Sequence, residues 1–256
     1  MRSITLLTLL LLAWPATVLA QFGLIFPSDD IVSAGENSSL SLRLGLFDPR
    51  DRRFQAVEKP RRFGVQYLGE QTDLLAILKP PQEQSAPSTA TFAIKRPGDH
   101  TFYAETTPQW EAEEDQFLIY QVKLCISSLG LEEGWDEPVG LEAEIVPLSR
   151  PYGLWSGNLF SGQVLVNGDP APYVAVEIAY LGLSPETPSP VTLPAAPYLL
   201  QKVRADGNGV FHYAMPRAGW WGFATTMEAD WTIQRNGAEK PVSLVTTIWV
   251  QTRDMP

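Results

Sequence analysis

Cysteine is almost absent from this sequence of 256 residues, which contains only Cys125. A single cysteine cannot form an internal disulfide, so the packing of side chains has to stabilise the fold. Cys125 lies in a β-favouring run, residues 117–126, where we expect it to be buried as a small apolar side chain. A thiolate metal site would usually bring a second cysteine or a histidine at short spacing, and none lies near Cys125.

Histidine is nearly as scarce, with only His100 and His212 in the chain. Histidine is the one side chain that titrates near neutral pH without perturbation, so a nucleophile activated by a base would depend on these two positions. Neither lies in a nucleophile-elbow or zincin motif. His212, between two aromatic residues of an expected strand, should point toward solvent. The sequence therefore predicts a protein that is not an enzyme.

Basic residues are outnumbered, since 29 Asp and Glu stand against 19 Lys and Arg and the formal charge is −10. This acidic balance argues against nucleic acid and anionic lipid as partners. Acidic residues gather at 111–115 and 132–137, where solvated loops are the expected structure. Two alternatives stay open: a site for a hard cation such as calcium, and a pair of carboxylates that hydrolyses glycosides.

Only one long apolar run occurs, and it lies at the amino terminus. Arg2 precedes the uncharged residues 4–13, and the segment then ends in Val18-Leu19-Ala20, which suits signal-peptidase cleavage. This arrangement is typical of a secretory signal peptide, residues 1–20, removed after Ala20. The run is too short for a membrane anchor, which needs about 20 apolar residues. We therefore expect an exported, soluble protein without stable membrane insertion.

Helix signals are scarce, whereas strand signals recur along the whole chain. Short runs rich in Val, Ile, Leu, Thr and aromatic residues alternate with Gly, Pro, Asn and Asp about every 8–12 residues, as in β-sandwiches. A Pro-containing break at 147–152 divides the chain. We predict an all-β fold with two consecutive β-sandwich domains, residues 21–148 and 149–256. The expected strands of the first are 38–46, 62–68, 73–78, 89–95, 98–105, 116–126 and 141–147.

The second half places turn glycines between runs of alternating apolar residues. The pattern G-x-V-x-x-x-G-x-P-x-x-x-V-x-V spans 162–176, D-x-x-G-x-F spans 206–211, and Ala218-Gly219-Trp220 follows. On these motifs the half resembles transthyretin-like or carboxypeptidase-regulatory-like domains, which implies a small sandwich that serves as a scaffold or binding module. Its expected strands are 162–166, 173–180, 199–204, 210–214, 220–225 and 242–251.

Eight tryptophans are many for this length, and Trp220 and Trp221 are adjacent. Neighbouring side chains of a strand point to opposite faces, so one of the two could be exposed and stack on a sugar or an apolar ligand. Packing of both, one of them under the Pro-rich loop 185–197, is the alternative we favour, because large aromatic side chains are usually mostly buried.

Several longer runs are unusual enough to suggest a family. They are Phe22-Gly-Leu-Ile-Phe-Pro-Ser-Asp-Asp-Ile31, Arg62-Phe-Gly-Val65, Ile94-Lys-Arg-Pro-Gly-Asp99, Gly134-Trp-Asp-Glu-Pro-Val-Gly140, Glu144-Ile-Val-Pro-Leu148, Arg150-Pro-Tyr-Gly-Leu-Trp155 and Tyr213-Ala-Met-Pro-Arg-Ala-Gly-Trp-Trp-Gly-Phe223. Together they resemble a bacterial domain-of-unknown-function family linked to the periplasmic components of cobalt and nickel uptake transporters. The resemblance implies a periplasmic location, a nickel or cobalt ion, and an inner-membrane metal transporter as partner.

Metal binding in the resembling family is expected to rest on histidines, one of them the first residue of the mature chain. The matching positions here hold Gln21, Asp48 and Tyr120. The resemblance thus implies a metal site at these three residues, with His100 as the candidate to replace a lost ligand. Nickel and cobalt prefer nitrogen ligands, so this site is expected to be degenerate.

We therefore expect a periplasmic binding or accessory protein associated with nickel/cobalt-type metal uptake. The alternative is a non-catalytic structural or ligand-binding β-sandwich module that has lost metal binding.

Overall fold

The computed structural model describes residues 21–57, 59–83, 86–183 and 194–256. These residues are mostly β-strands, and the one helical element among them is the 3-10 helix η1 (Ala196–Tyr198). The predicted all-β fold is therefore confirmed. The expected signal peptide, 1–20, lies outside the described residues, as do residues 184–193, which include most of the Pro-rich loop 185–197. Within the described part of the chain, no helix is long and apolar enough to cross a membrane.

One large sheet of eleven strands forms the middle layer of the molecule. Its two long central strands, β10 (Gln116–Ser128) and β19 (Ala238–Arg253), run parallel to each other. Their register extends from Phe117↔Val242 to Leu124↔Trp249. The main path of the sheet is β16 (Gln201–Arg204), β15 (Ala175–Gly182), β18 (Gly219–Arg235), β19 (Ala238–Arg253), β10 (Gln116–Ser128), β8 (His100–Glu105), β5 (Arg62–Tyr67) and β6 (Glu70–Asp73). The short strands β2 (Ile31–Val32), β9 (Gln109–Glu111) and β12 (Leu154–Trp155) pair at its margins.

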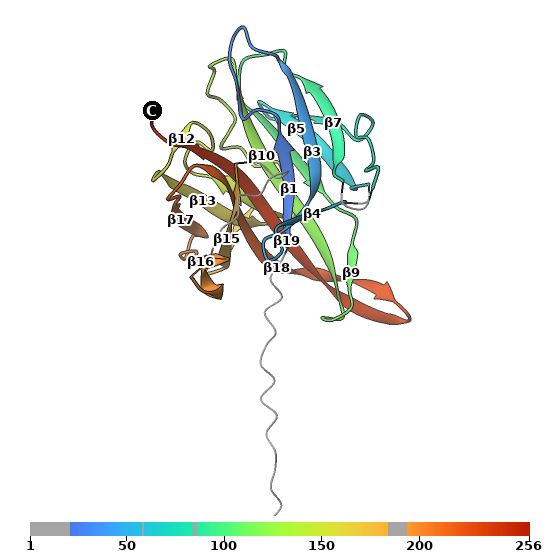
Figure 1. Cartoon of the computed structure of the whole chain (residues 1–256). Helices are drawn as coiled ribbons and strands as arrows, with labels where there is room; N and C mark the ends of the chain where they lie inside the picture. Colours follow the sequence, from blue (N-terminus) through green and yellow to red (C-terminus); the bar gives the residue numbers. More distant parts are fainter. Residues whose placement is uncertain (1–20, 58, 84–85, 184–193) are drawn as a thin grey trace, which may run out of the picture.

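Two smaller sheets complete the fold. The first contains β1 (Phe22–Pro27), β3 (Ser39–Asp48), β4 (Arg53–Gln55) and β7 (Ser88–Ala93). The second contains β11 (Ala143–Pro147), β13 (Leu159–Val166), β14 (Asp169–Pro170) and β17 (Val210–Ala214). Figure 1 shows β1 and β3 in front of the central strands, and β13 and β17 beside β15 and β16.

The two smaller sheets cover opposite faces of the large one. Successive side chains of a strand alternate between its faces, and those of β18 and β19 join different cores. Trp220 and Trp249 pack with residues of β1 and β3, whereas Trp221 and Ile248 pack with residues of β13 and β17. The sandwich-type packing is therefore built around one shared sheet, whose β10–β19 ladder crosses the expected boundary at residue 148. The division into 21–148 and 149–256 stays a prediction.

β3 shows why the alternation of the sequence predicts strands well. Leu40, Leu42 and Leu44 are buried, while Ser39 and Ser41 between them are exposed. The expected strand 73–78 is wrong, because β6 ends at Asp73 and a turn follows. The Asp73 carboxylate accepts a hydrogen bond from the Leu75 N–H at 2.8 Å, and such local side-chain bonds favour turns over ladders.

Trp249 fixes the amino-terminal strand to the core. Its indole Nε1–H donates to the Gly23 carbonyl at 2.6 Å, and Phe22 and Phe47 each contact the ring edge-on with centroids 6.1 Å apart. Gly222 makes room for the indole, since a Cβ there would lie 2.7 Å from it. The start of β1 is therefore held in a defined place, which positions the residues described next.

Candidate functional site

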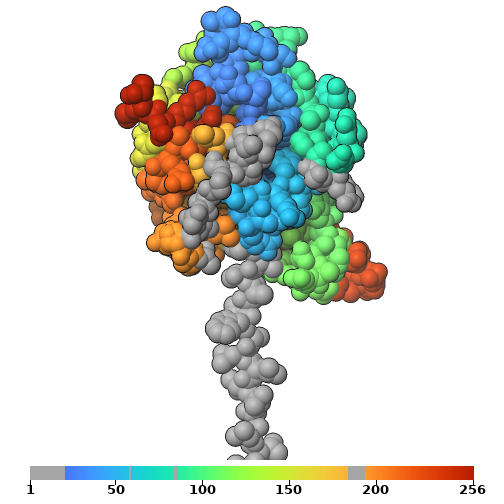
Figure 2. All heavy atoms as spheres, viewed as in Figure 1, coloured from blue at the N-terminus to red at the C-terminus, as the bar shows by residue number. Residues whose placement is uncertain are grey.

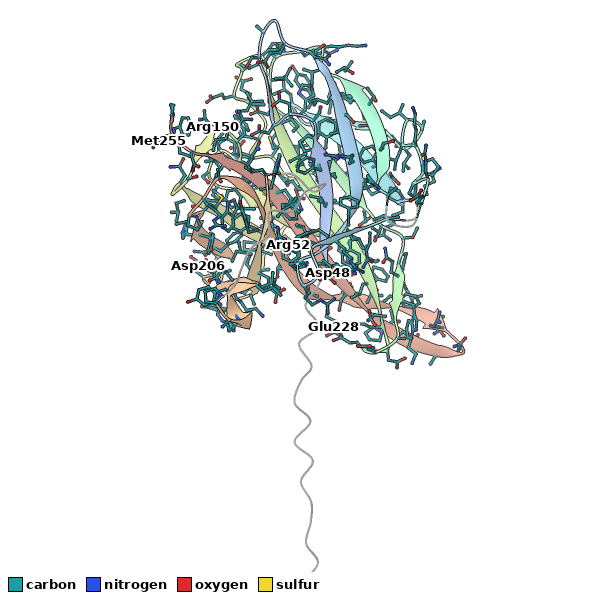
Figure 3. The ribbon with its side chains drawn as sticks, viewed as in Figure 1. Asp48, Arg52, Arg150, Asp206, Glu228 and Met255 are labelled. Carbon is teal, nitrogen blue, oxygen red and sulfur yellow. The ribbon has the colours of Figure 1, made fainter. Side chains whose placement is uncertain are left out.

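β1 and β3 bring the first of the expected site residues together. The two strands pair antiparallel, and their register begins at Phe22↔Phe47. Continuing that register by one residue places Gln21 opposite Asp48, although they are 27 positions apart in the sequence. Figure 3 labels Asp48 at the end of β3, close to the start of β4.

β10 adds the third residue from the sheet behind β1. A Cβ on Gly23 would lie 3.1 Å from the Val122 Cβ, so β1 passes directly over β10 at this point. Tyr120 is two residues from Val122 and therefore points to the same face of β10. The negative charge of Asp48 is near enough to the Tyr120 phenol to help raise its pKa. Gln21, Asp48 and Tyr120 thus converge at one end of β1, and we refer to these three residues as the amino-terminal cluster.

The Asp48 carboxylate is held by Arg50. Arg50 donates to it from Nε at 3.0 Å, from Nη2 at 2.7 Å and from its backbone N–H at 2.8 Å. Burial alone would raise the pKa of Asp48, but the hydrogen bonds and the charge of Arg50 outweigh that effect and lower the pKa. The carboxylate is therefore ionised at neutral pH and already paired with a cation.

Tyr120 contributes a neutral phenol to the cluster. Burial raises its pKa, and the negative charges of Glu111 and Asp48 add to that effect. Its side chain is 4% exposed and packs with Leu46, Val57, Leu118 and Val245. A phenol in such surroundings keeps its proton at neutral pH and is a poor ligand for a divalent ion.

The acidic segment 111–115 lies beside the amino-terminal cluster. Its residues are mostly exposed, as expected for a solvated loop. The charge of Glu111 helps to raise the pKa of Tyr120. The pKa of Arg50 is raised mainly by its hydrogen bond to Asp48, and the charges of Asp51 and Glu113 add to this effect. The surroundings of the cluster are therefore negative, which favours keeping a cation such as Arg50 there.

His100 does not join the cluster. It pairs with Ile126 across β8 and β10, six residues from Tyr120, which corresponds to roughly 20 Å along a strand. Its ring stacks on Tyr67 with centroids 4.9 Å apart, and Nδ1 lies 3.1 Å from the Gly98 carbonyl. Burial lowers the pKa of His100. The geometry therefore gives no support to His100 as a replacement ligand.

The residues of the amino-terminal cluster do not fit a nickel or cobalt ion. Both metals prefer imidazole or thiolate ligands, and the cluster offers an amide, a phenol and a carboxylate bound to Arg50. Across the described ranges, no group of three or more His, Cys, Asp or Glu side chains could hold a metal ion.

Other expectations about single residues are confirmed. Cys125 is 3% exposed, and burial raises the pKa of its thiol. His212 is exposed, and its Nδ1 lies 2.7 Å from the Ser161 hydroxyl oxygen. Trp220 and Trp221 are both buried, as the favoured alternative expected. Trp221, although buried, also lines a cavity of about 480 Å³.

Comparison of the sequence with protein families shows which family the chain belongs to. The model of the domain of unknown function DUF4198 matches residues 18–229. This chain belongs to the DUF4198 family. The match covers β1, β3 and β10, and therefore the whole amino-terminal cluster of this DUF4198 protein. No curated protein matches the sequence.

Solved structures similar to this DUF4198 chain are distant. Latent PorU from Porphyromonas gingivalis is 13% identical with a TM-score of 0.24, over 89% of this chain but only 20% of PorU. The D0-D1 domain of intimin is 11% identical with a TM-score of 0.22, over 88% of this chain and 96% of that domain. The adhesin InvE from Yersinia pseudotuberculosis is 14% identical with a TM-score of 0.24, over 88% of this chain and 58% of InvE. TM-scores this low carry no conclusion about function.

Proposed function

We propose that this chain is a periplasmic, non-catalytic accessory binding protein of the nickel/cobalt-uptake lineage, cut after Ala20, in which Arg50 occupies the place of the metal ion. One observation carries the proposal. Gln21, Asp48 and Tyr120, the positions that the family resemblance assigns to metal ligands, converge in space although they lie far apart in the sequence. An inner-membrane metal transporter is the proposed partner.

The chemistry of the cluster supports a degenerate site. Cleavage after Ala20 would make Gln21 the first residue, so its α-amine would lie beside the Asp48 carboxylate. Both oxygens of that carboxylate accept hydrogen bonds from the Arg50 guanidinium. This bidentate pair neutralises the carboxylate in the way that a bound metal ion would. Without an imidazole in the cluster, nickel and cobalt should bind weakly. The protein would then present its amino terminus to the partner without carrying a tightly held ion.

Restoring the missing ligands tests this function. Isothermal titration calorimetry with Ni²⁺ should be carried out on protein beginning at Gln21 and on the Gln21→His/Asp48→His variant. We expect the variant to bind Ni²⁺ at least about tenfold more tightly, a gain of about 1.4 kcal/mol, because two imidazoles replace an amide and a paired carboxylate.

A matched control carries two histidines elsewhere on the surface, in Ser41→His/Asp230→His, where both original side chains are exposed. It should bind no more tightly than the wild type. Tight Ni²⁺ binding by the wild type would contradict the role given to Arg50. Equal binding by the variant and the control would contradict the assignment of the cluster as a metal-site remnant.

A further inference from the structure

A cavity of about 480 Å³ lies in the carboxyl-terminal half, and none of its lining residues belongs to the amino-terminal cluster. Residues of β15, β17 and β18 line it, together with Tyr198 at the end of η1, Leu199 and Gln201 at the start of β16. Its volume lies within the range of about 300–1,000 Å³ that small-molecule sites occupy. The cavity is thus large enough for an organic molecule of several rings.

Three aromatic rings form a continuous wall of this cavity. Trp221 contacts Tyr180 with centroids 4.8 Å apart and Tyr213 with centroids 5.9 Å apart. The polar atoms of two of these rings are already satisfied within the protein. Trp221 Nε1–H lies 3.1 Å from the Arg217 carbonyl, and the Tyr180 hydroxyl donates to the Ala218 carbonyl at 2.8 Å. What the wall offers a ligand is therefore mainly apolar ring surface.

Arg217 places one positive charge at this aromatic wall. Its guanidinium carbon lies 5.3 Å from the centre of the Tyr180 ring. The Arg217 carbonyl accepts hydrogen bonds from Trp221 and from the Thr252 hydroxyl at 2.7 Å, so the backbone that carries the side chain is fixed. Among the residues that the structure describes, no carboxylate forms an ion pair with Arg217.

An unpaired guanidinium is notable in a chain of net charge −10. Two other exposed basic side chains of the same half have acidic partners, since Lys202 binds Glu177 at 2.8 Å and Arg253 binds Asp30 at 2.6 Å, and the exposed Arg204 donates to the Tyr173 carbonyl at 2.7 Å. Arg217 instead keeps its donors for solvent or for a ligand. A guanidinium that stacks on an aromatic ring and has free donors is suited to a planar carboxylate.

We propose that this cavity binds a small aromatic carboxylate, whose ring packs against Tyr180 and the exposed Tyr198 while its carboxylate pairs with Arg217. The inference goes beyond the accessory function proposed above and does not depend on the amino-terminal cluster. A neutral sugar fits less well, because sugars need several polar partners. The remaining amide of the lining, Gln201, already donates to the Pro197 carbonyl at 3.3 Å.

Paired probes that differ only in charge test the proposal on the mature chain. Naphthalene-2-carboxylate and naphthalene-2-carboxamide should be titrated separately, with calorimetry and tryptophan fluorescence as readouts. We expect the carboxylate to bind at least about tenfold more tightly than the amide, as one charge-assisted pair contributes about 1.5–3 kcal/mol. Arg217→Gln should remove this preference, and the fold should tolerate it because Arg217 is exposed.

Arg235→Gln is the matched control, since Arg235 also lies over an aromatic ring, 4.3 Å from the centre of Trp110, but outside the cavity. This variant should keep the full preference for the carboxylate. Tyr198→Ala, which removes a ring of the lining that is 58% exposed, should weaken both probes alike. Equal binding of both probes, no binding, or tighter binding of methyl β-glucoside than of the carboxylate would each overturn the proposal.

Discussion

At the scale of single residues, what a side chain binds depended on contacts that sequence patterns do not reveal. The convergence of Gln21, Asp48 and Tyr120 was expected only through the family resemblance, because no local pattern joins residues so far apart in the sequence. Arg50 was missed, although it lies two positions from Asp48. Its side chain reaches the carboxylate only because the chain turns sharply after β3, where the Arg50 N–H donates to Asp48.

Asp99 shows how a buried carboxyl group couples stability to pH. The side chain is 1% exposed, and burial raises its pKa to about 6. The Tyr152 hydroxyl donates to Oδ2 at 2.8 Å, while Oδ1 has no hydrogen-bond partner among the described residues. The charged form is therefore incompletely compensated in the folded protein.

The sign of this effect follows from the direction of the shift. A carboxyl whose folded pKa is raised contributes stability that is fully present below the ordinary value of 3.8 and is lost as pH rises to about 6. We therefore predict that Asp99→Asn increases the free energy of unfolding by ~2 kcal/mol at pH 7 and leaves it nearly unchanged at pH 3.5. Urea denaturation at the two pH values measures the difference. A variant that is less stable than the wild type at pH 7 would contradict the prediction.

At the scale of elements, the existence of most strands was predicted correctly, whereas the length of the longest hairpin was underestimated. β18 and β19 continue past the expected strands 220–225 and 242–251 into an arm that projects beyond the sheets beside β9 (Figures 1 and 2). The turn of this arm is Asn236-Gly237, with φ of 52° and 80°, a strong hairpin signal. Polar residues also alternate with Ala229, Trp231 and Ile233 along the arm, so the turn and the alternation together indicate a hairpin longer than the expected strands.

β1 was missed for a different reason. All six of its residues are buried, so its sequence shows no polar alternation. A fully buried strand of this length cannot be distinguished by period from other apolar segments. Its place in the fold depends on Trp249, which is 226 positions away and binds the Gly23 carbonyl.

Glu144 of β11 connects that strand to β10 and to the loop before β11. Its carboxylate accepts from the Lys123 ammonium and from three backbone N–H groups: Val139 at 2.7 Å, Gly140 at 2.9 Å and Leu141 at 3.2 Å. Both charged side chains of the pair are 2% exposed. Removing one charge of a buried pair leaves the other uncompensated in a medium of low polarity.

We predict that Glu144→Gln lowers the free energy of unfolding by about 3 kcal/mol, as measured by urea denaturation at pH 7. Glu177→Gln is the matched control, because Glu177 pairs with Lys202 at the surface, where the Lys202 side chain is 54% exposed. Its effect should stay below about 1 kcal/mol. Similar small effects of both substitutions would show that the buried pair does not anchor the loop.

At the scale of the whole molecule, the regular spacing of strand and turn signals predicted the all-β class. It did not predict that both halves contribute strands to one large sheet. Parallel pairing of β10 with β19 joins segments more than a hundred residues apart, and no local pattern encodes such a contact. Arg52 strengthens the connection, because its guanidinium donates to the carbonyls of Tyr180 and Leu181 at 3.2 and 2.6 Å. Figure 3 shows Arg52 between the two halves.

This architecture predicts that the two halves unfold together. Val164 is fully buried in the core beneath β13 and β17, and Val164→Ala should cost about 2 kcal/mol. Because β18 and β19 contribute side chains to both cores, the loss should also reach the distant core of β1, β3 and β8. Hydrogen exchange followed by mass spectrometry should show the slowest amides of β8 and of β13 accelerating by the same factor, about 30-fold for 2 kcal/mol.

The reciprocal substitution, Val65→Ala in the core beneath β1 and β3, serves as the comparison. It should accelerate hydrogen exchange of the slowest amides of β13 as much as that of β8. The long strands β18 and β19 contribute side chains to both cores, so they cannot stay folded when one core unfolds. If each substitution accelerated only the amides of its own half, segments 21–148 and 149–256 would be independent folding units. Equal acceleration in both directions would instead establish the shared sheet as the cooperative unit.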